Sequence, residues 1–479
     1  MAPRVHSSTR MRTSLLCMLT LAACDPGTRP GAPADAAPAA LADATPFVPI
    51  DAGVSPLVPH HVWSHRLPYG FVQALVPAGD DLVLAGTFSG TIDPGAGPLV
   101  SAGFSDIVLA RYDGDGALRW ARRAGGSGGD RPAGAALAPD GDVWMLSTFQ
   151  GDADFGGVTL HAVGTSDLAL SRYHGDGTHV STRQLGGTAE VHARGLAVDA
   201  HGRVAIAGSF HKTFDLGGGP LTSTDHLDDV FVAVYTPAGA LEWAHRLGGA
   251  KVDDCFDVAF APDGDLVLAG IFETSIDFGG GALLAQGPAD GFVARFTSDG
   301  HQRWARRVGG VWLDNVEAIV AGPDGDTLAA GYFTQSADFG AGPVATSGVA
   351  DAFVARWDQT GALRWIRHAP GFDVVAIYDL ALAPDGAARV TGSFRDWADF
   401  DGARLAGVAL QDVFMAGWAA DGAPGFAWSA GGPDEDQGTG LLVAGNGDLL
   451  VAGWLAGSID LGGGPLVGDG GTFLARMRP

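Results

Sequence analysis

The sequence predicts an all-β fold made of seven copies of one unit, and three observations predict it. An aspartate recurs at steps of 61 or 62 residues, at Asp93, Asp154, Asp215, Asp277, Asp338, Asp399 and Asp460. A phenylalanine that closes an apolar run keeps the same period, at Phe88, Phe149, Phe210, Phe272, Phe333 and Phe394, with Leu455 in the seventh copy. Each repeat also contains four short runs of β-branched, aromatic and small apolar residues, which favour strands over helices.

The turns between these runs predict how the strands connect. In the repeat from Cys255 to Val308, PDGD joins the first two runs and TSDG joins the last two. Asp-Gly supplies the positive φ that tight hairpins need, so each repeat predicts four antiparallel strands. A sheet of about 60 residues cannot bury both of its faces alone. We therefore expect the seven sheets to stack radially as a seven-bladed β-propeller, with an open solenoid as the alternative.

The two ends of the repeat region predict how the ring closes. HVWSHRL, around Trp63, matches the tryptophan-bearing fourth strand of a repeat, whereas TFLARMR, near the C-terminus, matches the third strand. Neither end is a complete blade. We expect the Trp63 strand to be the outer strand of the last blade, which would leave the ring without a free seam.

The repeat resembles a known bacterial family. VARYDxDGxLRW, followed by PDGD, VLAGxF and IDFGGG, is similar to the SBBP-type β-propeller repeat over residues 61 to 479. Its DG-x-L-R-W portion resembles the tryptophan-docking motif of quinoprotein propellers, which implies a ring packed between neighbouring blades. Val180 replaces this tryptophan in the second copy, so one contact between blades should be smaller. The resemblance implies an extracytoplasmic propeller and no defined reaction.

The N-terminal 23 residues have the order of an export signal. Arg4, Arg10 and Arg12 precede the apolar run LLCMLTLAA, which is too short to span a bilayer as a mature helix. The sequence LAAC that ends at Cys24 resembles the lipobox of bacterial lipoproteins, which implies cleavage before Cys24 and acylation of its thiol. An ordinary cleaved secretory signal is the alternative.

The resemblance to lipoproteins implies an exported protein that is lipid-anchored to a bacterial membrane, at the periplasmic face or at the cell surface. Which membrane holds it stays open. Residues 24 to 60 are rich in Ala, Pro, Asp and Gly and predict a flexible tether, and residues 61 to 479 form the propeller.

Composition restricts the class of partner. The formal net charge is −25, it becomes −28 without residues 1 to 23, and Lys212 and Lys251 are the two lysines. This acidity argues against nucleic acid as a partner and favours solubility, cations or basic protein surfaces. Cys17 belongs to the signal and Cys24 to the lipid, so we expect Cys255 to be a packed small residue rather than a nucleophile.

The glycine-rich stretch IDFGGG, with its aspartate at position 277, has two interpretations. An element present in every blade is expected to build the blade: its aspartate would accept hydrogen bonds from turn amides and its glycines would take positive φ. Seven such loops could instead hold Ca²⁺, but one carboxylate per loop is too few for a specific site. We therefore expect no cofactor. DGDG at residues 113 to 116 is likewise interpreted as a hairpin.

A localised function is expected where the repeats differ. The connections from the fourth strand to the next first strand share one face with those from the second strand to the third. The candidates on this face are His192, Arg194, His211, Lys212, Trp312, Asp314 and Asn315. Trp312 could stack on a sugar or anchor a protein, or it could be partly buried against a neighbouring loop. His192 and His211 could gather a metal with Asp225, His226 and Asp228, although their spacing matches no known ligand pattern.

Two classes of function follow from this reading. The first is a monomeric, non-enzymatic binding or scaffolding propeller for a protein or glycan at the cell envelope, attached to the membrane only through its lipid. The alternative is a hydrolase or lyase that acts on polysaccharide in the central funnel. Against the enzyme, seven near-equivalent aspartates offer no pair with separated pKa values, and no Ser-His-Asp constellation can be placed.

Overall fold

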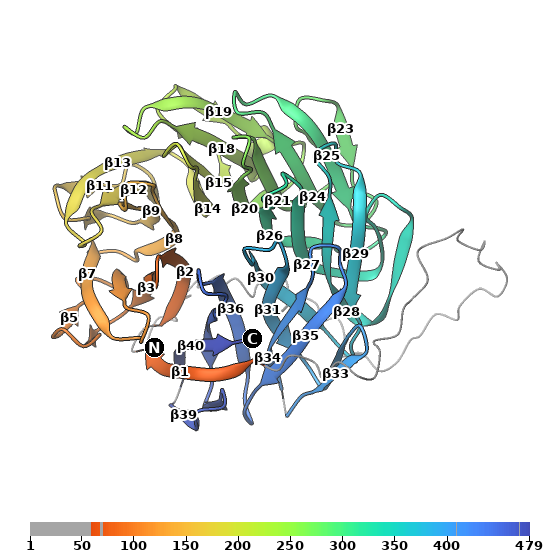
Figure 1. The fold of residues 1–479 in the computed structure, drawn as a ribbon. Coiled ribbons are helices and arrows are strands. Elements are labelled where there is room, and N and C mark those ends of the chain that lie inside the picture. The colour runs from red at the N-terminus through yellow and green to blue at the C-terminus, as the bar shows by residue number, and fades with distance from the viewer. Residues whose placement is uncertain (1–58, 68–69, 409, 469) are drawn as a thin grey trace, which may run out of the picture. The chain divides into compact units, whose positions relative to one another are not determined.

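The computed structural model describes residues 59–67, 70–408, 410–468 and 470–479, and it confirms the predicted fold. Seven antiparallel four-stranded sheets are arranged as the blades of a β-propeller (Figure 1). The predicted signal peptide, Cys24 and nearly all of the predicted tether lie outside the described residues. Within the described residues there is no α-helix, and one 3-10 turn, η1 (Thr224–His226), precedes a third strand. No helix among them is long and apolar enough to cross a membrane.

Each blade runs from an inner to an outer strand. The inner strands are β2 (Phe71–Ala78), β8 (Arg131–Leu137), β14 (Glu190–Val198), β20 (Asp253–Phe260), β26 (Asn315–Ala321), β30 (Val375–Leu382) and β36 (Asp436–Val443). The second strands are β3 (Asp81–Phe88), β9 (Val143–Phe149), β15 (Val204–His211), β21 (Leu266–Phe272), β27 (Thr327–Asp338), β31 (Ala388–Phe394) and β37 (Leu449–Leu455). Figure 1 shows the inner strands around the centre, where neighbouring inner strands contact one another.

The third and outer strands complete the blades. The third strands are β6 (Asp106–Tyr112), β12 (Asp167–Tyr173), β18 (Asp229–Tyr235), β24 (Asp290–Phe296), β28 (Pro343–Trp357), β34 (Asp412–Trp418) and β40 (Gly471–Arg478). The outer strands are β7 (Leu118–Gly126), β13 (His179–Gly187), β19 (Leu241–Leu247), β25 (Gln302–Val308), β29 (Leu363–Ala369), β35 (Pro424–Ala430) and β1 (His60–Leu67). We number the blades 1 to 7 from β2 onwards, so blade 7 is β36, β37, β40 and β1.

The N-terminal strand closes the ring, as the sequence predicts. β1 pairs antiparallel with β40, and its Trp63 lies opposite Arg476. The first described strand is thus the outer strand of the last blade. Inner strand β2 of blade 1 also contacts β36 of blade 7, so the ring has no open edge at this junction.

Short hairpins between the second and third strands are a feature that the sequence reading missed. They are β4 (Thr91–Ile92) and β5 (Leu99–Val100), β10 (Asp152–Asp154) and β11 (Thr159–His161), β16 (Thr213–Asp215) and β17 (Pro220–Thr222), β22 (Ser275–Asp277) and β23 (Ala282–Leu284), β32 (Trp397–Phe400) and β33 (Ala403–Ala406), and β38 (Ser458–Asp460) and β39 (Pro465–Val467). In blade 5 the hairpin is continuous with β27 and β28. The stretch IDFGGG is the turn of such a hairpin.

These hairpins join each blade to the preceding one. β10 of blade 2 pairs with the end of β7 of blade 1, and β16 of blade 3 pairs with the end of β13 of blade 2. Five of the seven outer strands end in, or are followed by, two glycines, and this has a steric reason. A Cβ at Gly249, the second glycine after β19, would lie 1.9 Å from the carbonyl oxygen of Ser275 in the next hairpin. Only glycine allows this approach of two backbones.

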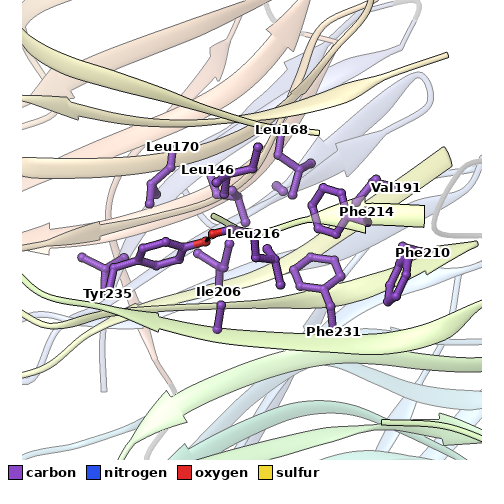
Figure 2. Packing of buried hydrophobic residues seen from close by; sticks show 14 of the residues in the cluster. Leu146, Leu168, Leu170, Val191, Ile206, Phe210, Phe214, Leu216, Phe231 and Tyr235 are labelled. Carbon is purple, nitrogen blue, oxygen red and sulfur yellow. Dashed lines mark hydrogen bonds between the residues drawn. The ribbon is translucent and has the colours of Figure 1, made fainter. Parts of the chain in front are cut away.

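The apolar core lies between blades. Figure 2 shows one such interface, where Leu146, Leu168 and Leu170 of blade 2 pack against Ile206 and Phe231 of blade 3. Phe214 and Leu216, from the hairpin of blade 3, insert into the same cluster. The aromatic side chains of the IDFGGG stretches therefore stabilise the interfaces between blades. Burial of each Phe contributes roughly 2 to 3 kcal/mol to the free energy of unfolding.

The tryptophans of the outer strands dock on the next blade. The indole Nε1 of Trp304 donates to the carbonyl of Gln359, 3.0 Å away in the turn of blade 5, and the ring covers Gly361, whose φ is +77°. Trp63, Trp120, Trp243 and Trp365 make the same bond. In blade 2 the docking position is Ser181, one residue after the predicted Val180, because Ser181 lies opposite Arg172 as Trp120 lies opposite Arg111. There Arg183 donates to the carbonyl of Gly239 at 2.7 Å.

Candidate functional site

Two rings of inner-strand residues are the places where the seven blades differ most. Every inner strand carries a β-bulge at the same point, where the strand register skips one residue. We call these residues the bulge ring: Gln73, Ala133, Arg194, Phe256, Glu317, Tyr378 and Thr439. The residues two positions earlier form the first ring: Phe71, Arg131, His192, Asp254, Asn315, Ala376 and Gln437. No residue type occurs twice within either ring, whereas the markers outside the rings recur in nearly every blade.

The part of the rings on blades 2 to 4 is rich in cationic and imidazole groups. Arg194 donates through Nη2 to Asp254 of the next blade at 3.2 Å, and its guanidinium carbon lies 5.5 Å from the centre of the Phe256 ring. Burial lowers the pKa of Arg131, and the neighbouring guanidinium of Arg194 lowers it further. Burial also lowers the pKa of His192, which favours the neutral imidazole. The two arginines therefore lie close enough to repel each other.

The part of the rings on blades 5 and 6 is acidic and aromatic. Asn315 donates through Nδ2 to Glu317 at 2.7 Å and to the phenol of Tyr332 at 3.4 Å. The hydroxyl of Ser393 donates to the phenol of Tyr378 at 3.3 Å. Burial raises the pKa of Tyr378 to about 12, so its hydroxyl stays protonated at neutral pH. The amide oxygen of Asn315 has no hydrogen-bond partner in the described chain, and the residue is 2% exposed.

Exposed apolar side chains surround these rings at the same end of the blades. They are Phe104, Leu227, Trp312, Val349, Phe372 and Leu410, and we call them the loop face. Phe104 is 86% exposed, Phe372 is 63% exposed and Trp312 is 49% exposed. The loops that lead into the third strands run beside the loops that lead into the inner strands, as the parallel bridges from Ser105 to Gly129 and from Ala350 to Val374 show.

The structure brings some of the predicted site residues together and separates others. His192 and Arg194 lie in the rings, and His211 is beside them: its Nε2 is 4.0 Å from Glu190, and its Nδ1 is 3.2 Å from Asp228. Asn315 lies two blades further round the first ring, on blade 5. Trp312 points outward from the loop that leads into the same strand.

Asp314 and Lys212 have positions that the sequence did not suggest. Asp314 is fully buried, and its two carboxylate oxygens accept the N–H groups of Gly310 at 2.7 Å and Thr334 at 3.0 Å. It therefore holds the Trp312 loop in place. Lys212 has a φ of +70° at the start of the blade 3 hairpin. At the equivalent position of blade 2, Gly151 has a φ of +64°. Its exposed side chain lies at a hairpin rather than in the rings.

Among the described residues, no group of three or more His, Cys, Asp or Glu side chains is arranged to hold a metal ion. The predicted alternative around His192 and His211 included His226, whose side chain lies outside what the structure describes. Cys255 is fully buried in the core between blades 3 and 4, and burial raises the pKa of its thiol. The thiolate needed for nucleophilic chemistry is thereby disfavoured.

Four junctions between blades contain a pair of buried aspartates that the sequence reading did not identify. Asp106, Asp229, Asp290 and Asp412 open the third strands, and Asp130, Asp253, Asp314 and Asp436 open the following inner strands or end the loops before them. The first glycine after each outer strand separates the pair: a Cβ at Gly309 would lie 2.8 Å from both carboxyls. Burial and, to a smaller extent, the paired carboxylate raise the pKa of Asp253 to about 8 and that of Asp314 to about 7.

The repeated aspartate makes the turn hydrogen bonds that the sequence analysis expects. Asp277 accepts the N–H groups of Gly279 at 2.7 Å and Gly281 at 3.2 Å through one oxygen, and both glycines have positive φ. Asp93, Asp215, Asp338 and Asp460 repeat the pair of bonds, while Asp154 and Asp399 each make one.

A depression of about 560 Å³ lies at the opposite end of the blades, beside β2, β8 and β14. Backbone and apolar groups line it, including Leu75, Ala135 and Val198, and Asp199 at its edge is paired with Arg203 at 2.7 Å. It offers few polar groups to fix the orientation of a ligand.

The sequence reading missed Arg131, Asp254, Phe256, Glu317 and Tyr378. A signal for them was present. Aligning the seven repeats by their aspartate and phenylalanine markers puts these residues at two positions where every copy differs. The bulge could not be foreseen from the apolar pattern, because a bulge adds one residue without changing the composition of the strand.

Comparison with known proteins adds one curated relative. No protein-family model matches the chain. The Regulatory protein FlaEY of Caulobacter vibrioides is 26% identical over 271 residues, which are 51% of this chain and 28% of that protein. The chain therefore matches less than a third of the length of this relative.

Solved structures show distant likeness. Sqt1 of Chaetomium thermophilum is 12% identical, with 83% of this chain and 96% of that chain covered and a TM-score of 0.40. Sqt1 of Saccharomyces cerevisiae is 8% identical, with 88% and 100% covered and a TM-score of 0.38. A protein of unknown function from Bacteroides caccae is 14% identical, with 64% and 85% covered and a TM-score of 0.35. At these values the likeness says nothing about function.

Proposed function

We propose that this chain is a non-enzymatic binding or scaffolding module, lipid-anchored through Cys24 at the bacterial cell envelope, whose loop face docks a protein partner. One observation carries the proposal: large apolar side chains are exposed on neighbouring loops, with Phe372 63% and Val349 39% exposed on two loops that pair with each other and Trp312 49% exposed at the adjacent junction. Isolated apolar residues are common on surfaces, but a group at one end of a propeller marks an interaction site.

Rigid loops strengthen this proposal. Buried Asp314 accepts the N–H of Gly310 on one side of the Trp312 loop and that of Thr334 on the next strand. Phe372 lies in the equivalent loop of the next junction, where the N–H of Phe372 donates to the carbonyl of Trp397 at 3.2 Å. Ordered loops lose little conformational entropy when a partner binds, so their aromatic side chains can act as anchors.

The roles of the acidic groups support binding rather than catalysis. The buried aspartates hold loop amides and lie beside glycines, and the repeated hairpin aspartates accept turn amides. A weak match to a regulatory protein agrees with a binding role, although it covers 28% of that protein.

Site-specific crosslinking in cells tests the proposal. A photoreactive amino acid in place of Phe372 should crosslink to a protein, and the crosslink should be lost when Trp312→Ser and Val349→Ser are added. The matched control is the same amino acid in place of Leu284, which is 66% exposed on an outer hairpin. Crosslinks that are equally abundant from both positions, or that survive the added substitutions, would contradict docking at the loop face.

A further inference from the structure

Hydrogen bonds and an ion pair join segments of blades 5 and 6 side by side at the loop face. The N–H of Val349, before the third strand of blade 5, donates to the carbonyl of Asp373 at 3.0 Å in the next junction. Arg395 joins two further segments, because its Nη1 donates to the carboxylate of Asp373 at 3.2 Å and its Nε donates to the carbonyl of Leu410 at 2.9 Å. These segments are therefore held next to one another.

The same surface continues to blade 7. A parallel bridge connects Gln411 to Glu435, and the N–H of Asp436 donates to the carbonyl of Gln411 at 2.9 Å. The joined segments therefore follow one another round the ring from blade 5 to blade 7. We call them the arc, and they are residues 346–350, 371–374, 395–396, 407–408, 410–411 and 433–436.

The arc exposes apolar side chains. Val349, Phe372, Val408 and Leu410 are all exposed, and Trp312 is exposed at the junction before the arc. Water covers these side chains in the free chain, so a partner that covers them gains the free energy of apolar burial. Because hydrogen bonds hold the arc, its backbone loses little conformational entropy when a partner binds.

The arc also carries negative charge that the chain leaves unpaired. The carboxylates of Asp396, Asp434 and Glu435 are exposed and make no ion pair with any described residue. Arg395 is the one cationic side chain of the arc, and it is paired with Asp373. Exposed apolar groups and unpaired carboxylates therefore lie on the same surface.

We propose that the arc binds a cationic apolar segment of a partner protein, in which Lys or Arg residues are interspersed with aliphatic or aromatic residues. This inference rests on the docking at the loop face proposed above, and it specifies the chemistry of the partner. The apolar residues of such a segment would cover Phe372 and its neighbours, while its cations would face Asp434 and Glu435 at the rim. Complementary charge accelerates association and disfavours acidic competitors.

Charge argues against two other occupants of the arc. A second copy of the chain has a formal net charge of −25, so approach of two copies is opposed by repulsion. The chain's own residues 24–58 contain a single arginine, Arg29, and four aspartates, which are Asp25, Asp35, Asp43 and Asp51. A separate cationic segment is therefore the occupant that the arc fits best.

Fluorescence anisotropy of labelled octapeptides tests the inference with the full-length protein in a non-ionic detergent. The probe contains Lys-Leu-Lys-Phe twice, and its acidic counterpart has Glu in place of every Lys. We expect the cationic probe to bind, and Asp434→Asn with Glu435→Gln to weaken it about threefold to tenfold. The matched control is Asp80→Asn with Asp115→Asn, which removes two exposed carboxylates from turns at the opposite end of blade 1 and should leave the affinity within twofold. Phe372→Ser should also weaken the probe at least tenfold.

The outcomes separate this inference from docking itself. Absence of cationic probe binding, equal losses in the two double variants, or equal binding of the acidic probe would each reject a cationic partner segment. If the Phe372 crosslink in cells survives any of these results, docking at the loop face stands and only the chemistry inferred for the partner is wrong. Sedimentation of the unchanged protein as a dimer that Phe372→Ser dissociates would instead assign the arc to a second copy.

Discussion

Replacing Asp436 with asparagine should remove a measurable part of the pH dependence of stability. Asp436 is fully buried at the start of β36, and its carboxylate accepts the N–H of Gly432 at 2.8 Å. Burial and, to a smaller extent, the carboxylates of Asp412 and Asp434 raise its pKa from 3.8 to about 6, against the opposing effect of the amides of Gly432 and Ala456. Asparagine keeps an acceptor for Gly432 and carries no charge.

The sign follows from the raised pKa. Between pH 4 and pH 6 the carboxyl is protonated in the folded chain and ionised in the unfolded chain, so unfolding releases a proton and stability falls as pH rises. The stability that Asp436 contributes is fully present below pH 4 and is lost by the time pH passes 6. A pKa difference of about 2 corresponds to about 3 kcal/mol.

Urea denaturation of the unchanged protein and Asp436→Asn at several pH values measures this effect. The variant should gain about 3 kcal/mol over the unchanged protein between pH 4 and pH 7, because all other ionisable groups cancel in the difference. Asp434→Asn, which removes one charge that raises the pKa of Asp436, should reduce the pH dependence without abolishing it. If the free energy of unfolding changes with pH in the same way for the unchanged protein and for Asp436→Asn, the raised pKa of Asp436 is refuted.

Three further predictions concern the repeats and the anchor. Asp277→Ala and Asp338→Ala should each cost about 1 to 2 kcal/mol in thermal melts, with no response to Ca²⁺, whereas a calcium-dependent rise lost in either variant would indicate ligand-binding loops. Trp304→Ala should cost about 3 to 5 kcal/mol in urea denaturation and Ser181→Ala, at the equivalent position of blade 2, less than about 1, and equal costs would argue against tryptophan docking. Cys24→Ser should release the protein from membranes or block its processing, and membrane attachment that still requires detergent for release would exclude the lipid anchor.

The sequence was informative about the architecture because each marker has one physical role in every blade. The Asp-Gly turns need positive φ, and Gly264 has a φ of +84°. The phenylalanine and tryptophan markers fill interfaces between blades, so their period is the period of the blades. The small hairpins escaped prediction because strands of two to four residues have no measurable apolar alternation. The additional pairing of β10 and β16 with outer strands of the preceding blades depends on the folded ring.

The candidate site was only partly predictable, for a related reason. Trp312 stands out because it replaces a small residue in an exposed loop, and a loop residue can be recognised without knowing its neighbours. Arg131 and Asn315 lie on strands, and each is one ordinary polar residue in its own repeat. Their significance comes from the ring that brings blade 2 and blade 5 to a common centre.

The contrast between the repeated and the variable positions bears on how such a chain can specialise. Residues such as Asp277 and Trp304 serve the contact between adjacent blades, and a change in one copy costs stability at one junction. Bulge residues such as Arg194 and Phe256 are skipped in the strand register, so their side chains can vary without changing the backbone ladder. The same bulge that bends each inner strand thus provides seven independently variable positions around one axis, which is where a binding site with several different side chains can form.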